Sequence, residues 1–263
     1  MNKSSHPPAR PSATIVVARE GQSAAEILLV RRRAGDAFGD SYAFPGGVVD
    51  HDESGAHIFC AGRSAEEADA ILDIADGLDY YSAAIRELFE ETGILLARDS
   101  AGNWAADEPD MGQLREEVDK GKLRWADFLR QKNLCMAADA LHYFAYWETP
   151  YVRPKRWQTR FFIAALPQGQ TATHDGSEVT DIRWLNAADA LSLGKRGQLP
   201  MPYPTIMNLR DLVGMNTVAE LVAWARARPA LGIEKIRPVE KRIDGRAYVL
   251  IPGDEGYDGV DSL

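Results

Sequence analysis

Cysteine, long apolar runs and excess positive charge are all scarce in this sequence. Its 263 residues include two cysteines, Cys60 and Cys135, which cannot form the disulfide framework of a secreted protein, so we expect a reducing intracellular compartment. No stretch approaches the roughly 18 apolar residues that a membrane-spanning helix needs. The first segment, MNKSSHPPARPSA, lacks the apolar core of a secretory signal. These absences predict a cytoplasmic protein without a membrane partner.

The charge balance disfavours nucleic acid as a partner. The chain has 30 Lys and Arg against 39 Asp and Glu, a net charge of −9, so a nucleic-acid-binding face would require the basic residues to be clustered. An apolar content of 45% is ordinary and excludes a wholly disordered chain. The length suffices for one large domain, or one domain with a sizeable extension.

The order of the predicted elements indicates an α/β fold in which helices flank a mixed sheet. Residues 1–11 hold three prolines and predict a disordered tail, and β-rich runs over 12–20 and 26–33 predict a hairpin. The periodicity and caps predict helices over 64–76, 79–92, 113–131 and 187–193, and strands over 94–97, 140–148, 158–166 and 178–185. Ser64 and Glu67 form a capping box at the start of the first helix, Gly93 ends the second, and Gly121 interrupts the third.

Prolines at 200, 202 and 204 mark a boundary between a main domain over 12–195 and an extension over 196–263 that packs on it. The extension is predicted to contain a helix over 205–228 and a hairpin over 236–251, whose Asp244-Gly245 fits a tight turn. The apolar residues of 205–228 recur at helical spacing. They predict a face that packs on the domain or on a second copy of the chain, as in a homodimer.

A group of glutamates carries the strongest functional signal. Glu87, Glu90 and Glu91 stand at i, i+3 and i+4 of the predicted helix 79–92, so their carboxylates share one face. Like charges at this spacing destabilise a helix unless a cation lies among them, and Mg²⁺ binds through oxygen ligands such as carboxylates. The alternative is a solvated acidic face in which Arg86 pairs with Glu90.

The sequence around these glutamates resembles the Nudix box. Gly47 is followed after five residues by Glu53, and the second half of the box reads Arg86-Glu87-Leu88-x-Glu90-Glu91-x-Gly93-Ile94. Every fixed position is filled, but 32 residues separate Glu53 from Arg86 where the family pattern has seven. We interpret residues of about 54–78 as a helical insertion. Its position inside the box predicts that it lies near the mouth of the site and influences substrate choice.

The resemblance implies a Nudix α/β/α sandwich and the hydrolysis of a diphosphate linked to another moiety, with Mg²⁺ or Mn²⁺ as cofactor. Carried over residue by residue, Glu87, Glu90 and Glu91 would be metal ligands. The carbonyl of Gly46 is a further candidate ligand. Arg86 would hold the carboxylates in place.

Two further carboxylates receive roles from the same resemblance. Glu53 would support the metal site or its water shell. Glu178 opens the predicted strand 178–185, where several family members carry a late carboxylate, and it is a candidate general base. The alternative for Glu178 is an ordinary charge at a strand edge.

Weaker motifs narrow the branch of the family. The split box, Phe-Pro-Gly-Gly-Val-Val-Asp at 44–50, Trp147-x-Thr149-Pro150 and Thr159-Arg160-Phe161-Phe162 are similar to the peroxisomal coenzyme A diphosphatases and their bacterial relatives. This resemblance implies coenzyme A or an acyl-CoA as substrate. ADP-ribose, NADH or a nucleotide sugar is the alternative within the class, and a non-catalytic nucleotide sensor is the alternative outside it.

Basic side chains beside the predicted cleft are candidates for binding phosphate. Arg31 and Arg33 point the same way on a strand, so we expect one or both to face the cleft, unless the strand end lies in solvent. The 150–160 loop supplies a basic cluster with one aromatic residue, suited to a nucleotide base and its phosphate: Lys155, Arg156, Trp157 and Arg160. For Arg160, packing within the strand is the alternative.

Overall fold

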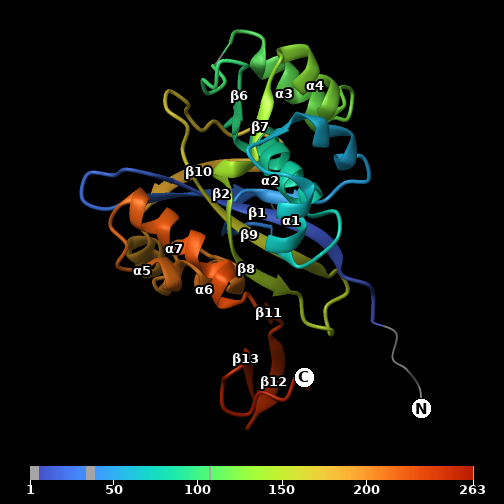
Figure 1. Ribbon diagram of the computed structural model, residues 1–263. Coiled ribbons are helices and arrows are strands. Elements are labelled where there is room, and N and C mark those ends of the chain that lie inside the picture. Colours follow the sequence, from blue (N-terminus) through green and yellow to red (C-terminus); the bar gives the residue numbers. More distant parts are fainter. Residues whose placement is uncertain (1–5, 34–38, 107, 263) are drawn as a thin grey trace.

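The computed structural model describes residues 6–33, 39–106 and 108–262 (Figure 1). A mixed eight-stranded sheet forms its centre, in the order β10 (Val179–Leu185), β2 (Glu26–Arg32), β1 (Arg10–Arg19), β9 (Trp157–Ala165), β8 (His142–Glu148) and β11 (Lys235–Ile236). Two short strands complete it: β3 (Tyr42–Ala43) pairs with β2, and β4 (Gly46–Val48) pairs with β1. The pairings of β1 with β9 and of β8 with β11 are parallel, and the others are antiparallel.

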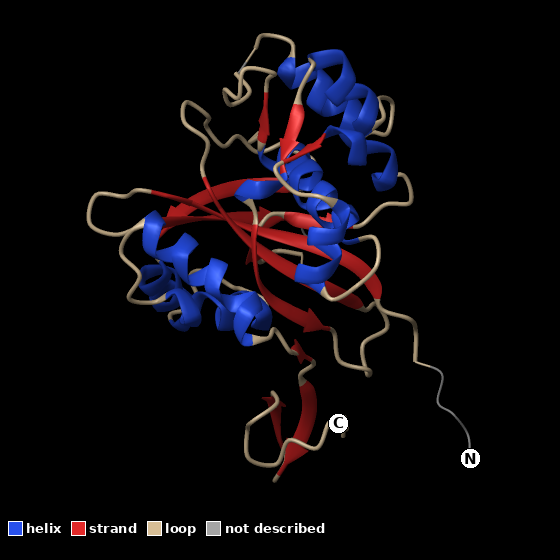
Figure 2. Cartoon of the chain, viewed as in Figure 1, coloured by secondary structure: helices blue, strands red, loops and turns tan. Residues whose placement is uncertain are grey.

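Helices cover both faces of this sheet (Figure 2). One face packs on α1 (Ala65–Leu72) and α2 (Gly77–Thr92), and the other on α5 (Ala187–Lys195), α6 (Tyr203–Leu212) and α7 (Val218–Leu231). The central strands are buried on both faces, which explains why β1 and β2 read as nearly continuous apolar runs. The expected α/β class, with helices on both sides of a mixed sheet, is therefore confirmed.

The insertion folds into three elements. The 3₁₀-helix η1 (Glu53–Phe59) leads into β5 (Cys60–Ala61) and then into α1, which begins with the capping box predicted from Ser64 and Glu67. Strand β5 joins a second sheet with β6 (Ala97–Arg98) and β7 (Cys135–Ala137). This small sheet lies beside α3 (Met111–Asp119) and α4 (Trp125–Lys132), at the top of Figure 1.

Several boundaries differ from the prediction. Strand β1 begins at Arg10, so the last two residues of the expected tail 1–11 pair with β9; residues 1–5 of that tail lie outside the described residues. The helix predicted over 113–131 is divided around the expected interruption at Gly121 into α3 and α4. The strand predicted over 94–97 overlaps β6 only at Ala97, and α1 ends at Leu72, with Asp73 in the left-handed conformation.

The C-terminal extension packs on the main domain. The helix predicted over 205–228 is interrupted between α6 and α7, because Gly214 has a φ of 91° and Thr217 starts a new capping box. Buried residues of both helices belong to the core beneath the sheet, so their apolar face is occupied within the chain. Strands β12 (Val239–Ile243) and β13 (Arg246–Leu250) form the predicted hairpin, with positive φ at both turn residues. Among the described helices, none is long and apolar enough to cross a membrane.

Candidate active site

Helix α2 positions the predicted acidic cluster. Its Ile85, Leu88 and Phe89 are fully or almost fully buried in the core, which fixes the rotation of the helix and turns the glutamates toward the β3–β4 segment. The helix ends as predicted at Gly93, whose φ is 73° and whose N–H donates to the carbonyl of Phe89 at 2.9 Å.

The Arg86 guanidinium joins the two halves of the split box. Its Nε donates to Glu53 Oε1 at 2.9 Å, and its Nη1 lies 2.8 Å from Glu90 Oε2 and 3.1 Å from Glu87 Oε1. Its Nη2 donates to the Val48 carbonyl at 3.0 Å. Burial alone would lower the pKa of Arg86, but the fields of the carboxylates beside it raise that pKa. Arg86 is therefore a buried, permanently charged centre around which the carboxylates are arranged.

Glu53 reaches this centre although 33 positions separate it from Arg86 in sequence. Its other carboxylate oxygen accepts a hydrogen bond from the hydroxyl of Ser82, one turn before Arg86 on α2. Burial raises the pKa of Glu53 to about 7, and the nearby Arg86 charge opposes that rise. The insertion therefore leaves the link between the two halves of the box intact.

The two glycines of the β4 segment approach the glutamates closely. The N–H of Gly46 donates to Glu91 Oε2 at 3.1 Å, while its carbonyl accepts a hydrogen bond from Arg32. A Cβ at Gly47 would lie 2.4 Å from the carboxylate oxygens of Glu87. Only glycine at this position leaves Glu87 its observed place.

Arg32 is the second cation of the cluster. Its Nη2 lies 2.8 Å from Glu91 Oε1, and the field of Glu91 raises the pKa of Arg32. Glu91 is 2% exposed, and its Oε1 has no well-oriented hydrogen bond despite this ion pair. Residue Glu91 thus keeps a buried oxygen available to a further positive group.

The two arginines only partly neutralise the carboxylates of α2. Burial raises the pKa of Glu90 and of Glu91 to about 8, partly opposed by Arg86 and Arg32 respectively, and it also raises the pKa of Glu87. Within the described ranges, no group of three or more His, Cys, Asp or Glu side chains is arranged to chelate a metal as it stands. The glutamates point to Arg86 and Arg32, so side-chain rotation would have to accompany the binding of a cation.

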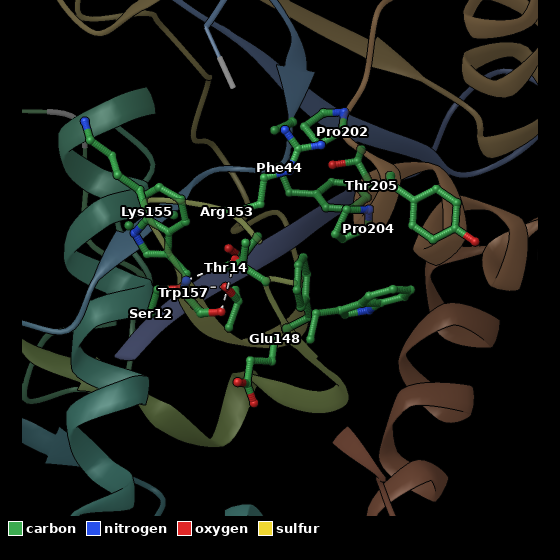
Figure 3. Close-up of a pocket in the computed structure, with 18 of the residues that line it drawn as sticks. Ser12, Thr14, Phe44, Glu148, Arg153, Lys155, Trp157, Pro202, Pro204 and Thr205 are labelled. Carbon is green, nitrogen blue, oxygen red and sulfur yellow. Dashed lines mark hydrogen bonds between the residues drawn. The ribbon is translucent and has the colours of Figure 1, made fainter. Parts of the chain in front are cut away.

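A cavity of about 890 Å³ extends from this cluster. Glu87, Gly46 and Gly47 line it together with Glu178, and residues of the 149–157 loop, the start of α6 and the hairpin line it elsewhere. Figure 3 shows Lys155 and Trp157 on one side and Pro202, Pro204 and Thr205 on the other. Its size lies in the range of about 300–1,000 Å³ typical of small-molecule sites.

Residues 52–212 match the family model described as the NUDT19 Nudix domain. The chain is a Nudix hydrolase. It is 26% identical to the acyl-coenzyme A diphosphatase NUDT19 of Xenopus laevis, over 88% of this chain and 71% of the frog protein. It is 30% identical to the human protein of that name, over 66% of this chain and 49% of the human protein.

Other relatives agree with this membership. The putative nudix hydrolase 7 of Caenorhabditis elegans is 25% identical over 97% of this chain and 76% of its own length. The crystal structure of a NUDIX hydrolase from Alicyclobacillus acidocaldarius superposes with a TM-score of 0.70 at 26% identity, covering 82% of this chain and 96% of that chain. The fold and the recognised box therefore belong to the same family.

The structure brings most of the predicted Nudix residues together. Arg86, Glu53 and the three glutamates of α2 form one cluster with Gly46, and Glu178 lies on the cavity that this cluster adjoins. Asp175 holds the backbone before β10, because its Oδ1 accepts from the N–H of Glu178 at 2.7 Å. Lys155 and Trp157 also line the cavity, as predicted for substrate contacts.

Four arginines that were predicted to bind substrate do not line the cavity. Arg31 pairs with Asp40, and Arg33 donates to the Gly176 carbonyl at 2.6 Å. Arg156 is buried and holds Glu148. Arg160 is buried between the rings of Tyr80 and Tyr146, each with its centroid 4.5 Å away.

Two cations of the cavity were not predicted, Arg32 and Arg153. Strand alternation contained a signal for Arg32, which lies on the same face as Leu28 and Val30, and this face packs against α2. The sequence alone did not show which face α2 covers. Arg153 stands in a proline-flanked loop without periodicity, where no sequence signal fixes a direction.

The insertion does not lie where we expected it. No residue of 54–78 lines the cavity. Ala68 and Leu72 are instead buried in the core beside α2, and Ala75 lies beyond the end of α1 and is exposed. The insertion is attached to box residues at both ends, but this attachment does not place it at the mouth of the site. Helix α1 packs against the start of α2, behind the glutamates.

Proposed function

We propose that the protein is a divalent-metal-dependent diphosphatase whose substrate is coenzyme A or an acyl-CoA. The observation that carries this proposal is a cluster of buried carboxylates, only partly neutralised by arginines, beside a large cavity with a mostly apolar lining. A substrate of the proposed kind would place its diphosphate at the carboxylate cluster, through a bound cation, and its extended organic moiety in the cavity. The name of the frog and human relatives, acyl-coenzyme A diphosphatase, supports the substrate class.

The donor set suits Mg²⁺ or Mn²⁺. Both cations prefer oxygen ligands, and Glu87, Glu90 and Glu91 would supply carboxylates, including the buried Oε1 of Glu91 that lacks a well-oriented hydrogen bond. When bound, such a cation neutralises phosphate charge and lowers the pKa of a water molecule. The Gly46 carbonyl is held by Arg32, so it would join this set only after Arg32 moves.

The chain's own residues supply positioning and proton transfer. Arg86 and Glu53 hold the glutamates from behind, and Arg32 holds Glu91 from the sheet. Glu178 lines the cavity with Glu87 and is the proposed general base, a role for which a carboxylate must lie within hydrogen-bond reach of the attacking water.

The test is a substrate panel with purified protein and Mg²⁺, scored by product mass. We expect coenzyme A to give 3′,5′-ADP and 4′-phosphopantetheine, with activity lost on chelation and restored by Mg²⁺ or Mn²⁺. Activity confined to ADP-ribose, NADH or a nucleotide sugar would favour the alternative substrates. Thioester hydrolysis without diphosphate cleavage would refute the proposal.

A further inference from the structure

The cavity has more than one charged region. Near the glutamate cluster its lining cation is Arg32, which is occupied by Glu91 and Gly46. The remaining cations among its described lining residues are Arg153 and Lys155, which come from the single loop between β8 and β9. Figure 3 shows Lys155 beside Trp157, with Arg153 between this side and the prolines opposite.

From this placement we propose that Arg153 and Lys155 bind a phosphate monoester that the substrate carries away from its diphosphate. The inference rests on the proposed function, and it narrows the ligand to a 3′-phosphorylated adenine nucleotide such as coenzyme A. Trp157 lines the same part of the cavity and offers an aromatic face for the base. ADP-ribose, NADH and nucleotide sugars have no such monoester and would offer no second anion to Lys155 and Arg153.

The C-terminal hairpin orients Arg153. The Nε of Arg153 donates to Glu240 Oε1 at 2.6 Å, and its Nη2 lies 2.6 Å from the same oxygen. This contact uses one edge of the guanidinium, and the Nη1 side can donate to a second anion. The Arg153 side chain is 57% exposed and that of Glu240 is 13% exposed, so the carboxylate is the fixed partner and the guanidinium remains accessible from the cavity.

Further contacts fix the loop itself to the C-terminal extension. The N–H of Tyr151 donates to Asp261 Oδ2 at 3.1 Å, and the Arg237 guanidinium lies 3.8 Å from the centroid of the Tyr151 ring. The other oxygen of Asp261 accepts from the N–H of Glu240 at 2.8 Å. The extension therefore holds Arg153 and its loop in place, which assigns the hairpin a part in substrate recognition.

Charge balance in this part of the cavity favours an anionic ligand. Two carboxylates line this part of the cavity: Glu240 pairs with Arg153, and Glu148 is 8% exposed and neutralised by Arg156 and by Lys235, whose Nζ lies 2.6 Å from it. The charge of Lys155 is then left over. Lys155 is exposed on the loop. A phosphate dianion placed between Lys155 and Arg153 would gain charge-assisted hydrogen bonds without displacing a buried ion pair.

The experiment compares ligands that differ by one phosphate group. Binding of 3′,5′-ADP and of 5′-AMP is measured by calorimetry, and kcat/KM is measured on coenzyme A and on dephospho-coenzyme A. In Arg153→Ala and Lys155→Ala, we expect the preference for the phosphorylated member of each pair to fall about 10- to 100-fold, as for the loss of a hydrogen bond to a charged group. Arg242→Ala is the matched control, because Arg242 is exposed on β12 and does not line the cavity.

Equal affinity of the wild-type protein for 3′,5′-ADP and 5′-AMP would overturn the inference, even if coenzyme A is hydrolysed. An equal loss of preference in Arg242→Ala would also overturn it, because the effect would then reflect net charge alone. If coenzyme A is not cleaved but the preference for 3′,5′-ADP depends on Arg153 and Lys155, the proposed function fails while the phosphate site stands.

Discussion

Gly47, the first residue of the Nudix box, and Gly46, which precedes it, should respond differently to the same substitution. At Gly46, φ is +148°, and an added Cβ would lie 2.3 Å from the carbonyl oxygen of Ala13 and 2.6 Å from the Cα of Thr14. Those neighbours are backbone atoms of the central strand β1 and cannot move aside. At Gly47 the atoms in the way are the end of a flexible side chain, the Glu87 carboxylate, 2.4 Å from the added Cβ.

The magnitudes follow from these contacts. Gly46→Ala combines backbone strain of about 1–3 kcal/mol with overpacking of about 1–3 kcal/mol. Together they amount to about 2–6 kcal/mol, so we expect a Tm lowered by about 4–24 °C, at about 2–4 °C per kcal/mol for a domain of this size. In Gly47→Ala, Glu87 must retreat by about 1 Å to reach ordinary contact distance. Unfolding should then change by less than about 1 kcal/mol, while a displacement of this size in a catalytic group can lower kcat about 100-fold.

The assay pairs thermal or urea unfolding of each variant with kcat on the best substrate of the panel. Gly47→Ala should retain the wild-type Tm and lose turnover, and Gly46→Ala should lose stability first. A Gly47→Ala enzyme with wild-type kcat would refute the reasoning, because Glu87 would then be dispensable in its observed place. Equal destabilisation by both substitutions would contradict the assignment of one contact to backbone and the other to a side chain.

Three further predictions concern other parts of the chain. Glu90→Gln should lower turnover with Mg²⁺ by at least about 100-fold at unchanged Tm, and near-wild-type turnover would remove Glu90 from the metal site. Leu72→Ala should cost about 2–4 kcal/mol in urea unfolding, against almost nothing for Ile58→Ala, which is 76% exposed in the same insertion; equal values would make the insertion a passive loop. Burial, with the Arg226 charge, lowers the pKa of His142 to about 4, so the unfolded state binds more protons between about pH 4 and 6.5 and stability falls as the pH drops through that window. When the pH is lowered from 7 to 4.5, the free energy of unfolding of His142→Gln should therefore fall by about 2–3 kcal/mol less than that of the wild type. An equal fall in both proteins, measured by urea unfolding, would contradict this.

Local signals predicted the elements that local chemistry controls. The capping box at Ser64, the left-handed end of α2 at Gly93 and the tight turn at Asp244-Gly245 are each determined by residues a few positions apart. The spacing of Glu87 and Glu90 likewise predicts their shared face from helix geometry alone. Such features depend on helix and turn geometry, which the sequence encodes directly.

Features that depend on layer packing could not be predicted in the same way. Alternation along β2 separates Arg32 from Arg31 and Arg33, but only the position of α2 shows that the Arg32 face meets the glutamates. Arg160 looked like a phosphate ligand because it is basic and lies close to Trp157 in sequence. Residues three positions apart in a strand point to opposite faces, and on its own face Arg160 lies between two tyrosine rings.

The split box shows why an insertion of this length can leave a catalytic cluster intact. Ser82 and Arg86 of α2 hold Glu53 directly, so its place in the cluster does not depend on the length of chain between Glu53 and α2. The inserted helix buries Leu72 in the same core that fixes the rotation of α2, and burial of one leucine stabilises by about 1.5–3 kcal/mol. This burial offsets part of the conformational entropy that is lost when the insertion becomes ordered. It also supports the helix that carries the glutamates. Because the insertion packs behind that helix, we expect substrate selection to depend instead on the loop between β8 and β9 and on the C-terminal hairpin that holds it.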